Sequence, residues 1–407
     1  MSKTAPPAMR RLPPLVQPLT AGILAAVVGF ASAFAIVLQG LAGVGASPGQ
    51  AASGLLILCV GQGALAIFLG LRHRQPLSIA WSTPGAALLM GAGIPAGGFG
   101  VAVSAFLITG ILIVVAGLWR PLGRAVAAIP LSLASAMLAG VLMGLCLAPV
   151  QAVARAPALA LPIVLAWAMG WCVARRYAVL IAIMVTVAIV AATTAMPADA
   201  LTLLRPRLIF VAPVFDLLPA FGIAIPLFIV TMASQNVPGA AVLKTNGYEA
   251  PIGEVLVATG LGSVATTFFG GHGLNLSAIT AALCAGPEAG ADPARRYVAS
   301  VAAGGAYIIL GLLAGLAAAF IATSPPLLIQ AVAGLALLSS LVAAMTAALA
   351  CEKHRLAAII TFVTAASGVG IFGIGAPFWG LLAGGMLLML ERGVEAVRNT
   401  ESTTARI

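Results

Sequence analysis

Apolar runs of similar length follow one another along almost the whole chain, separated by short polar or Gly/Pro-rich breaks. A helix needs about 20 predominantly apolar residues to cross the hydrocarbon core of a bilayer. The pattern therefore predicts an all-α polytopic membrane protein with about 14 transmembrane segments. The predicted spans are 17–41, 50–71, 77–92, 98–119, 129–150, 157–174, 177–196, 214–243, 251–269, 275–287, 297–322, 326–349, 355–373 and 375–394.

The third span is short and cannot be one continuous helix, because Pro76 and Pro84 both interrupt it. The stretch Leu77–Trp81 is expected to be a short extended strand. Ser82 or Thr83 then suits the N-cap of a half-helix, and a proline fits the first turn that follows.

The tenth span has the same form. Glycine and histidine fill positions 270–273 and lead to a short extended strand, after which Ser277 is expected to cap a second half-helix. Two half-helices that begin near the bilayer midplane would point free N–H groups and partial positive charge at each other, which favours a small anion such as a carboxylate. The alternative is that the Ser and Thr residues only cap kinked helices and touch no ligand.

The distribution of charge supports fourteen spans. With the N-terminus inside, only three of the 20 Lys and Arg residues lie outside, namely Arg155, Arg205 and Arg207. Leaving out the two short spans would move five more to the outside, against the positive-inside rule. Those five are Arg120, Arg124, Arg175, Arg176 and Lys244.

Composition excludes a soluble protein. The chain is 62% hydrophobic and 7% charged, with a mean hydropathy of +1.14, whereas about a quarter of a soluble domain is charged. The net charge of +10 does not indicate nucleic-acid binding, because the basic residues sit in small groups at the ends of apolar runs. The five cysteines show no CxxC spacing, so neither a disulfide framework nor a metal site is expected, and no cofactor is predicted.

The two halves of the chain resemble each other. Gly61 and Gly63 in the second span coincide with Gly260 and Gly262 in the ninth, and a short stretch beginning at Ser82 matches the tenth span at nearly the same offset. Seven spans per repeat is an odd number, so the second copy must be inverted, an arrangement typical of secondary transporters. Chance similarity between Gly/Ala-rich helices is the alternative for each match alone.

Polar residues inside the eighth span are candidates for substrate binding. Thr231, Gln235 and Asn236 lie within an apolar run, where an amide is unfavourable unless it has a partner. Thr231 and Gln235 are four residues apart, so an α-helix would place them on one face. Hydrogen bonding between helices is the alternative explanation.

Four further residues are candidates. Gln39 is the strongly polar residue deep in the first span, where Phe30 and Phe34 are spaced to form an aromatic wall, although aromatic side chains more often face lipid or core. His272 is a candidate for proton coupling, with a purely structural role as the alternative. No HExxH, GxSxG or Walker A motif is present, which disfavours an intramembrane enzyme.

Three segments together resemble the BenE-type benzoate–proton symporters of bacteria: 75–85, 233–239 with Gly247-Tyr-Glu249, and 268–275. The similarity runs from about Pro18 to Arg392. More distantly, the chain is similar to the nucleobase–cation symporters and the sulfate/anion transporters. These share a seven-plus-seven inverted repeat, which here implies core-domain segments 17–119 and 214–322, gate-domain segments 120–197 and 326–394, and a cytoplasmic tail 395–407.

The resemblance also implies a binding site between the two half-helices. The residues that match its positions are Thr83, Ser277, Ala278, Ile279 and Thr280, with Thr231 and Gln235 as the polar pair of the eighth span. The nucleobase transporters carry glutamates where this chain has Thr231 and Ile279, and their absence favours an anionic substrate. The proton would then travel on His272, through water, or with the substrate carboxylate.

The predicted function is import of benzoate or a similar aromatic carboxylate with protons, by alternating access, across a bacterial inner membrane with both termini cytoplasmic. The alternative is exchange or leak of another small anion. Relatives of the fold are often dimers, and a homodimer is expected by resemblance alone. The substrate-binding candidates are Phe30, Phe34, Gln39, Ser82, Thr83, Thr231, Gln235, Asn236, Ser277, Ala278, Ile279 and Thr280.

Overall fold

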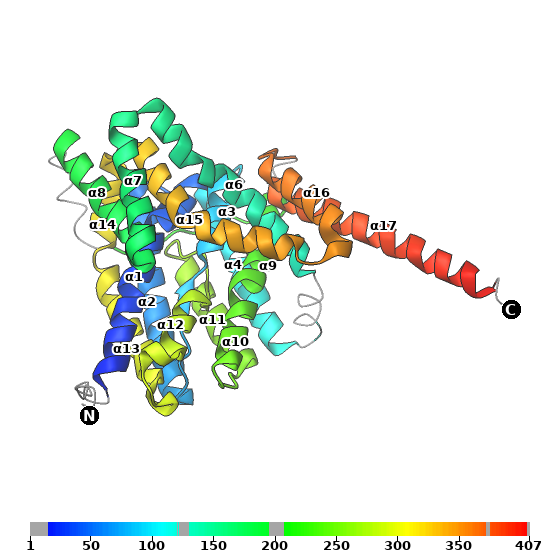
Figure 1. Ribbon diagram of the computed structural model, residues 1–407, viewed down its shortest axis with the longest axis horizontal. Coiled ribbons are helices and arrows are strands. Elements are labelled where there is room, and N and C mark those ends of the chain that lie inside the picture. The colour runs from blue at the N-terminus through cyan, green and yellow to red at the C-terminus, as the bar shows by residue number, and fades with distance from the viewer. Residues whose placement is uncertain (1–14, 120, 122–129, 195–206, 372–374, 405–407) are drawn as a thin grey trace, which may run out of the picture.

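The computed structural model describes residues 15–119, 121, 130–194, 207–371 and 375–404. The basic residues at positions 3, 10, 11, 120, 124, 205 and 406, which entered the charge argument, lie outside these ranges. Within them the chain is almost entirely helical (Figure 1). The first half contains α1 (Val16–Gly43), α2 (Pro48–His73), β1 (Ile79–Trp81), α3 (Thr83–Ala92), α4 (Phe99–Leu118), α6 (Leu131–Arg155), α7 (Pro157–Ala174) and α8 (Ala178–Thr193).

The second half repeats this alternation of long helices with one strand and one short helix. It contains α9 (Leu217–Thr231), α10 (Val237–Thr245), α11 (Ile252–Thr267), β2 (Leu274–Leu276), α12 (Ile279–Ala285), α13 (Tyr297–Gly311), α14 (Ala314–Thr323), α15 (Pro326–Leu349), α16 (Arg355–Ala366) and α17 (Ala376–Thr404). Short strands and short helices thus occupy the two stretches where the sequence predicted interrupted spans. Helix α17 continues to Thr404, so most of the expected tail is helical.

Among the described residues, seven helices are long and apolar enough to cross a membrane, or eight if α13 and α14 count as one bent span. That pair bends by 56° between Gly311 and Ala314. Helices α8 and α11 are apolar but shorter. A helix suits lipid because all its interior backbone groups are bonded within the segment.

The predicted eighth span is one helical stretch, Leu217–Thr245, but its middle is not a regular α-helix. Between α9 and α10, residues Met232–Asn236 form a π-helical segment. Pro238 lies in the first turn of α10 and has no N–H, and in a regular α-helix its ring would clash with the carbonyl of Ser234. The wider π turn accommodates that proline, and such turns occur frequently at functional sites.

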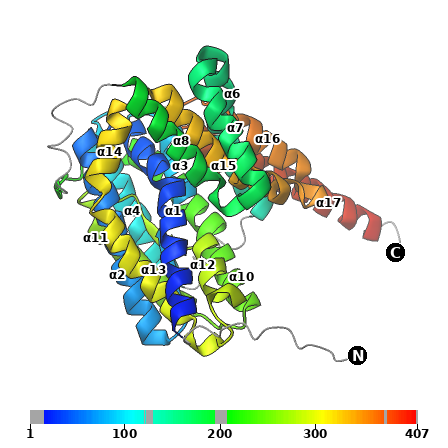
Figure 2. The same cartoon turned by 60° about the vertical axis from the view of Figure 1, so that its left-hand side comes forward.

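The helices pack in two groups. In one, α2 packs against α13 and α4 against α11, while α1 contacts α13 and α9 contacts α4. In the other, α6 packs against α15 and α16, and α16 against α17. Figures 1 and 2 show the first group around α1 and α2, and α17 projecting from the second towards the C-terminus.

Glycines allow the closest helix contacts. A Cβ added to Gly304 of α13 would lie 2.6 Å from the carbonyl oxygen of Gly63 in α2. A Cβ added to Gly260 of α11 would lie 2.9 Å from the carbonyl oxygen of Gly110 in α4. These positions bring backbones into direct contact, as small residues do in membrane proteins.

Candidate functional site

A two-stranded antiparallel ribbon packs against α2 and α11 of the first helix group. Strands β1 and β2 pair with Ile79 opposite Leu276, Ala80 opposite Asn275 and Trp81 opposite Leu274. The ribbon extends by one bond, in which the N–H of Ser277 donates to the carbonyl of Ser78 at 2.8 Å. Because the strands are antiparallel, α3 and α12 begin at opposite ends of the ribbon.

Three buried side chains accept hydrogen bonds from backbone N–H groups on the outer edges of this ribbon. The Oε1 atom of Gln62 accepts the N–H of Trp81 at 2.7 Å. On the other strand, Ser263 Oγ accepts the N–H of Leu274 at 2.8 Å and Asn236 Oδ1 accepts that of Leu276 at 2.9 Å. An open sheet edge at membrane depth has no water to satisfy it. Asn236, predicted to bind substrate, is therefore engaged in holding the ribbon.

The start of α3 is fixed by Ser82, which is its N-cap. The hydroxyl of Ser82 accepts the N–H of Gly85 at 3.1 Å and the hydroxyl of Thr231 at 2.8 Å. The carbonyl of Ser82 lies 2.9 Å from Nε2 of His272. Thr83 follows as the first helical residue and is half-buried. The cap and its partners thus come from three different parts of the chain.

The start of α12 is organised in a similar way, one residue later than predicted. The helix begins at Ile279, but the hydroxyl of Ser277 still accepts the N–H of Thr280 at 3.1 Å. Gln235 Oε1 accepts the N–H of Ala278 at 3.4 Å. The hydroxyl of Thr280 bonds the side chain of Tyr307. The side chain of residue 279 lies outside the described part of the structure.

Thr231 and Gln235 do not lie on one face of a regular α-helix, contrary to the sequence prediction. The π-helical segment begins directly after Thr231 and contains Gln235. The wider turn changes their relative direction, so that Thr231 contacts the start of α3 and Gln235 the start of α12. The eighth span consequently joins the two short helices.

A row of four aromatic rings lies beside the start of α3. Phe30 and Phe34 are stacked with centroids 5.5 Å apart. Trp81 makes edge contacts with Phe30 at 6.1 Å and with Tyr307 at 5.8 Å. All four side chains are buried. Sequence reasoning singled out the two phenylalanines but missed Trp81, despite its place directly before Ser82, and Tyr307, for which the sequence held no signal.

Three polar side chains near this region have a buried nitrogen atom without a partner among the described residues: His272 Nδ1, Gln39 Nε2 and Gln62 Nε2. His272 is fully buried and packs edge-on against Phe106. Because a carbonyl oxygen only accepts, the His272 Nε2 atom must carry the proton in the neutral ring, which leaves a lone pair on Nδ1. Gln39 precedes Gly40, which packs against Ala86 of α3.

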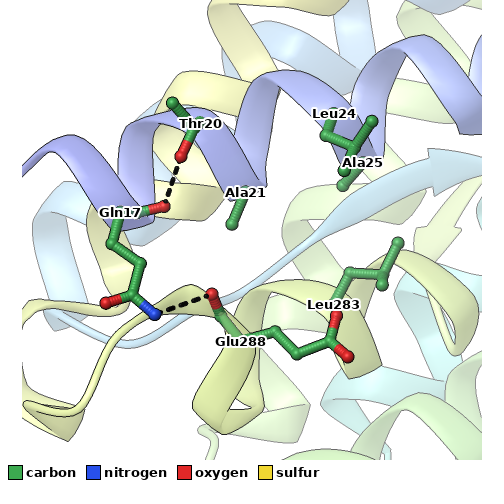
Figure 3. A pocket seen from close by; sticks show the side chains of 7 residues that line it. All are labelled: Gln17, Thr20, Ala21, Leu24, Ala25, Leu283 and Glu288. Carbon is green, nitrogen blue, oxygen red and sulfur yellow. Dashed lines mark hydrogen bonds between the residues drawn. The ribbon is translucent and has the colours of Figure 1, made fainter. Parts of the chain in front are cut away.

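Two cavities open elsewhere in the molecule. One, of about 270 Å³, lies between the start of α1 and the end of α12 and includes Gln17, Leu283 and Glu288 (Figure 3). The other, of about 400 Å³, lies between α6, α9 and α17, and its apolar lining ends at Arg392. None of the predicted substrate-binding residues lines either cavity.

Comparison with known protein families gives one match that covers nearly the whole chain. Residues 14–390 match the family model BenE, described as benzoate membrane transport protein. Inner membrane protein YdcO of Escherichia coli (strain K12) is 38% identical over 90% of this chain and 94% of its own length. The benzoate membrane transport protein of Acinetobacter baylyi is 30% identical over 89% of this chain and 92% of its own.

Solved structures with the same fold are more distant in sequence. The transmembrane domain of the cyanobacterial bicarbonate transporter BicA superposes with a TM-score of 0.59 at 16% identity, covering 90% of this chain and 97% of that domain. SLC26A9 superposes with a TM-score of 0.63 at 13% identity, covering 91% of this chain and 65% of the other. At these identities the likeness concerns the fold alone.

Proposed function

This chain belongs to the BenE family of benzoate membrane transport proteins, and from that premise we propose that it imports benzoate or a similar aromatic carboxylate together with protons. Members of the family are membrane transporters and not enzymes, and this chain is an integral membrane protein with the fold of the BicA transmembrane domain and SLC26A9. The substrate class, the coupling and the direction are parts of the proposal.

The observation that supports an aromatic carboxylate best is the aromatic row beside the N-cap of α3. Trp81, which contacts Phe30 and Tyr307, directly precedes Ser82 and Thr83. A bound ring would lie against these apolar faces. Its carboxylate would accept hydrogen bonds from the first turn of α3, from Gln39 and from the polar residues around Ser277. The absence of a carboxylate side chain among the candidates favours an anion.

The chain is proposed to cross the membrane fourteen times as an inverted repeat. The packing partners support this, because exchanging the two halves turns the pair α2–α13 into α11–α4, and α1–α13 into α9–α4. The distribution of Lys and Arg in the sequence supports a proposed orientation in which both termini lie on the cytoplasmic side of a bacterial inner membrane. A homodimer is also part of the proposal, by resemblance alone.

Transport would proceed by movement of one helix group against the other. Helices α1–α4 and α9–α14 form the proposed core, and α6–α8 and α15–α17 the proposed gate. The cavity between α6, α9 and α17 lies at the boundary of these groups. Since eight of the twelve candidate side chains are buried, namely Phe30, Phe34, Ser82, Thr231, Gln235, Asn236, Ser277 and Thr280, access to them requires such a movement.

The proton is proposed to be carried by His272 or with the substrate itself as the neutral acid. The lone pair on His272 Nδ1 is buried, and His272 is bonded through Ser82 to the start of α3. Protonation there would add a charge next to the proposed carboxylate and so couple the two ions.

The decisive experiment is uptake of radiolabelled benzoate into proteoliposomes with an inward proton gradient, with and without an uncoupler. Empty liposomes control for passive entry of neutral benzoic acid. Protein-dependent accumulation that collapses with the uncoupler supports the proposal, and a Ser277→Leu variant with normal expression should abolish it. Normal uptake by that variant contradicts the proposed site, and no uptake above empty liposomes directs the search to other small anions.

A further inference from the structure

Arg296 is a buried cation at the start of α13. Its side chain is 8% exposed, and its Nε and Nη1 atoms donate to the carbonyls of Gly290 and Ala285, both at 2.8 Å. No carboxylate in the described ranges forms an ion pair with it. Its neighbour Arg295 is half-exposed and pairs with Asp292 at 3.2 Å. Two adjacent arginines therefore have different surroundings.

A buried guanidinium is tolerated only where its charge and donors are matched. Ala285 is the last residue of α12. Its carbonyl is one of the last four in the helix, which have no N–H partner within the helix. The carbonyls at a helix C-terminus also carry partial negative charge, which a cation stabilises. Arg296 thus takes the place of a C-terminal cap for α12.

The same guanidinium fixes the turn that follows α12. The planar group reaches two carbonyls five positions apart, and between them lies the 3-10 turn Pro287–Ala289. From α1, Gln17 donates to the carbonyl of Glu288 at 3.3 Å (Figure 3). The turn is therefore bonded by side chains from two different elements, and Glu288 lines the cavity between α1 and α12.

Tyr248 holds Arg296 and the residues just before it. Its hydroxyl donates to the carbonyl of Pro293 at 2.8 Å, and its side chain also bonds that of Arg296. Tyr248 lies in the connection between α10 and α11, so Arg296 joins α12 to a segment that follows the π-helical turn.

Helix α12 is only seven residues long, about 10 Å, so a shift at its C-terminal end is transmitted to its beginning. Its beginning carries Ser277 and Thr280, which belong to the proposed site. We infer that Arg296 is a positioning residue that clamps the C-terminal end of α12 and so holds the substrate-facing end in its binding arrangement. That this end of α12 faces substrate rests on the proposed function, whereas the role of Arg296 in holding the C-terminal end of α12 does not.

Cys284 provides a probe of the clamp that does not depend on transport. It lies in the last turn of α12 and is fully buried, whereas Cys172 and Cys351 are exposed. With the two exposed cysteines replaced by serine, maleimide labelling of Cys284, located by mass spectrometry, reports opening around α12. Arg296→Gln removes the hydrogen bonds from the charged guanidinium to the carbonyls of Ala285 and Gly290, and this loss should accelerate labelling at least about tenfold.

The matched control is Arg295→Gln, which makes the same change of charge one residue away and should leave the labelling rate unchanged. Arg296→Lys keeps the charge but not the planar fork, so it should restore the rate only in part. In transport assays Arg296→Gln should raise KM for benzoate about tenfold with the amount of folded protein unchanged. A merely structural defect would instead lower the maximal rate without raising KM.

Equal labelling of Cys284 in Arg296→Gln and Arg295→Gln would overturn the inference. If Arg296→Gln does not yield folded protein, Tyr248→Phe, which removes one support, should give a smaller acceleration, and an unchanged rate there is equally contradictory. If the wild-type protein transports no benzoate, the proposed function fails while the labelling comparison still decides the clamp.

Discussion

The hydroxyl of Thr231 donates a hydrogen bond of 2.8 Å to the hydroxyl of Ser82, although the two residues are 149 positions apart. Ser82 is the N-cap of α3, and Thr231 is the last residue of α9 before the π-helical segment. The bond therefore ties the orientation of the short helix to the span that also supports α12. Both side chains are fully buried, so no water replaces a missing partner.

Removing this hydroxyl without changing the shape of the side chain tests that tie. Thr231→Val should weaken apparent benzoate affinity about tenfold, because a lost buried hydrogen bond costs about 1–2 kcal/mol. Thr231→Ser keeps the donor and should stay close to wild type. The concentration dependence of uptake measures the effect, and equal affinities in the two variants would contradict it.

Asn236 and Gln235 are adjacent but are expected to respond differently. Asn236→Leu leaves the buried N–H of Leu276 without a partner and should lower the free energy of unfolding by about 1–3 kcal/mol. Gln235→Leu removes only a longer bond to Ala278 and should act mainly on substrate affinity. Thermal unfolding in detergent, monitored by fluorescence-detected size-exclusion chromatography, separates these effects, because only Asn236→Leu should lower the unfolding temperature markedly. A thermally stable Asn236→Leu variant would show that the ribbon edge does not depend on this amide.

Gly304 and Gly305 form a matched pair in α13. A Cβ at Gly304 would meet the carbonyl oxygen of Gly63 at 2.6 Å, whereas a Cβ at Gly305 has no heavy atom within 4 Å. Gly304→Ala should therefore separate α2 from α13 and destabilise the protein by about 1–3 kcal/mol. Gly305→Ala should leave the unfolding temperature unchanged. Similar unfolding temperatures for both variants would rule out the backbone contact.

The aromatic row predicts discrimination between ring substrates and aliphatic acids. Phe30→Leu keeps an apolar side chain but removes the stacking partner of Phe34 and the edge contact with Trp81. Benzoate affinity should fall about threefold to tenfold, as expected for loss of one aromatic interaction. Competition by cyclohexanecarboxylate should be unaffected. A parallel loss for both acids would mean that the row does not touch the ring.

His272 can be separated from its structural bond. His272→Gln can place an amide donor near the carbonyl of Ser82 but cannot take up a proton at the position of Nδ1. If His272 carries the proton, gradient-driven accumulation should be lost while exchange of labelled for unlabelled benzoate continues. Accumulation at the wild-type level would mean that the substrate carboxylate, and not His272, carries the proton.

The sequence by itself determined the membrane character, the approximate positions of most long helices and the family. The energy of placing a residue in hydrocarbon depends on that residue and its near neighbours, so apolar runs locate α1, α7 or α15 to within a few positions. Proline and glycine act locally as well, and they marked the two interruptions that became β1 with α3 and β2 with α12.

Only the tertiary structure decided which polar groups are free for a ligand. The roles of Gln62 and Asn236 depend on a ribbon whose strands are nearly two hundred positions apart in the chain, and no local pattern specifies that register. The same holds for Tyr307, which reaches the aromatic row from α13, and for Arg296, whose partners are backbone carbonyls. Hydrogen bonds and ring contacts are set by distance in space, and in lipid each buried polar group must find its partner within the folded protein.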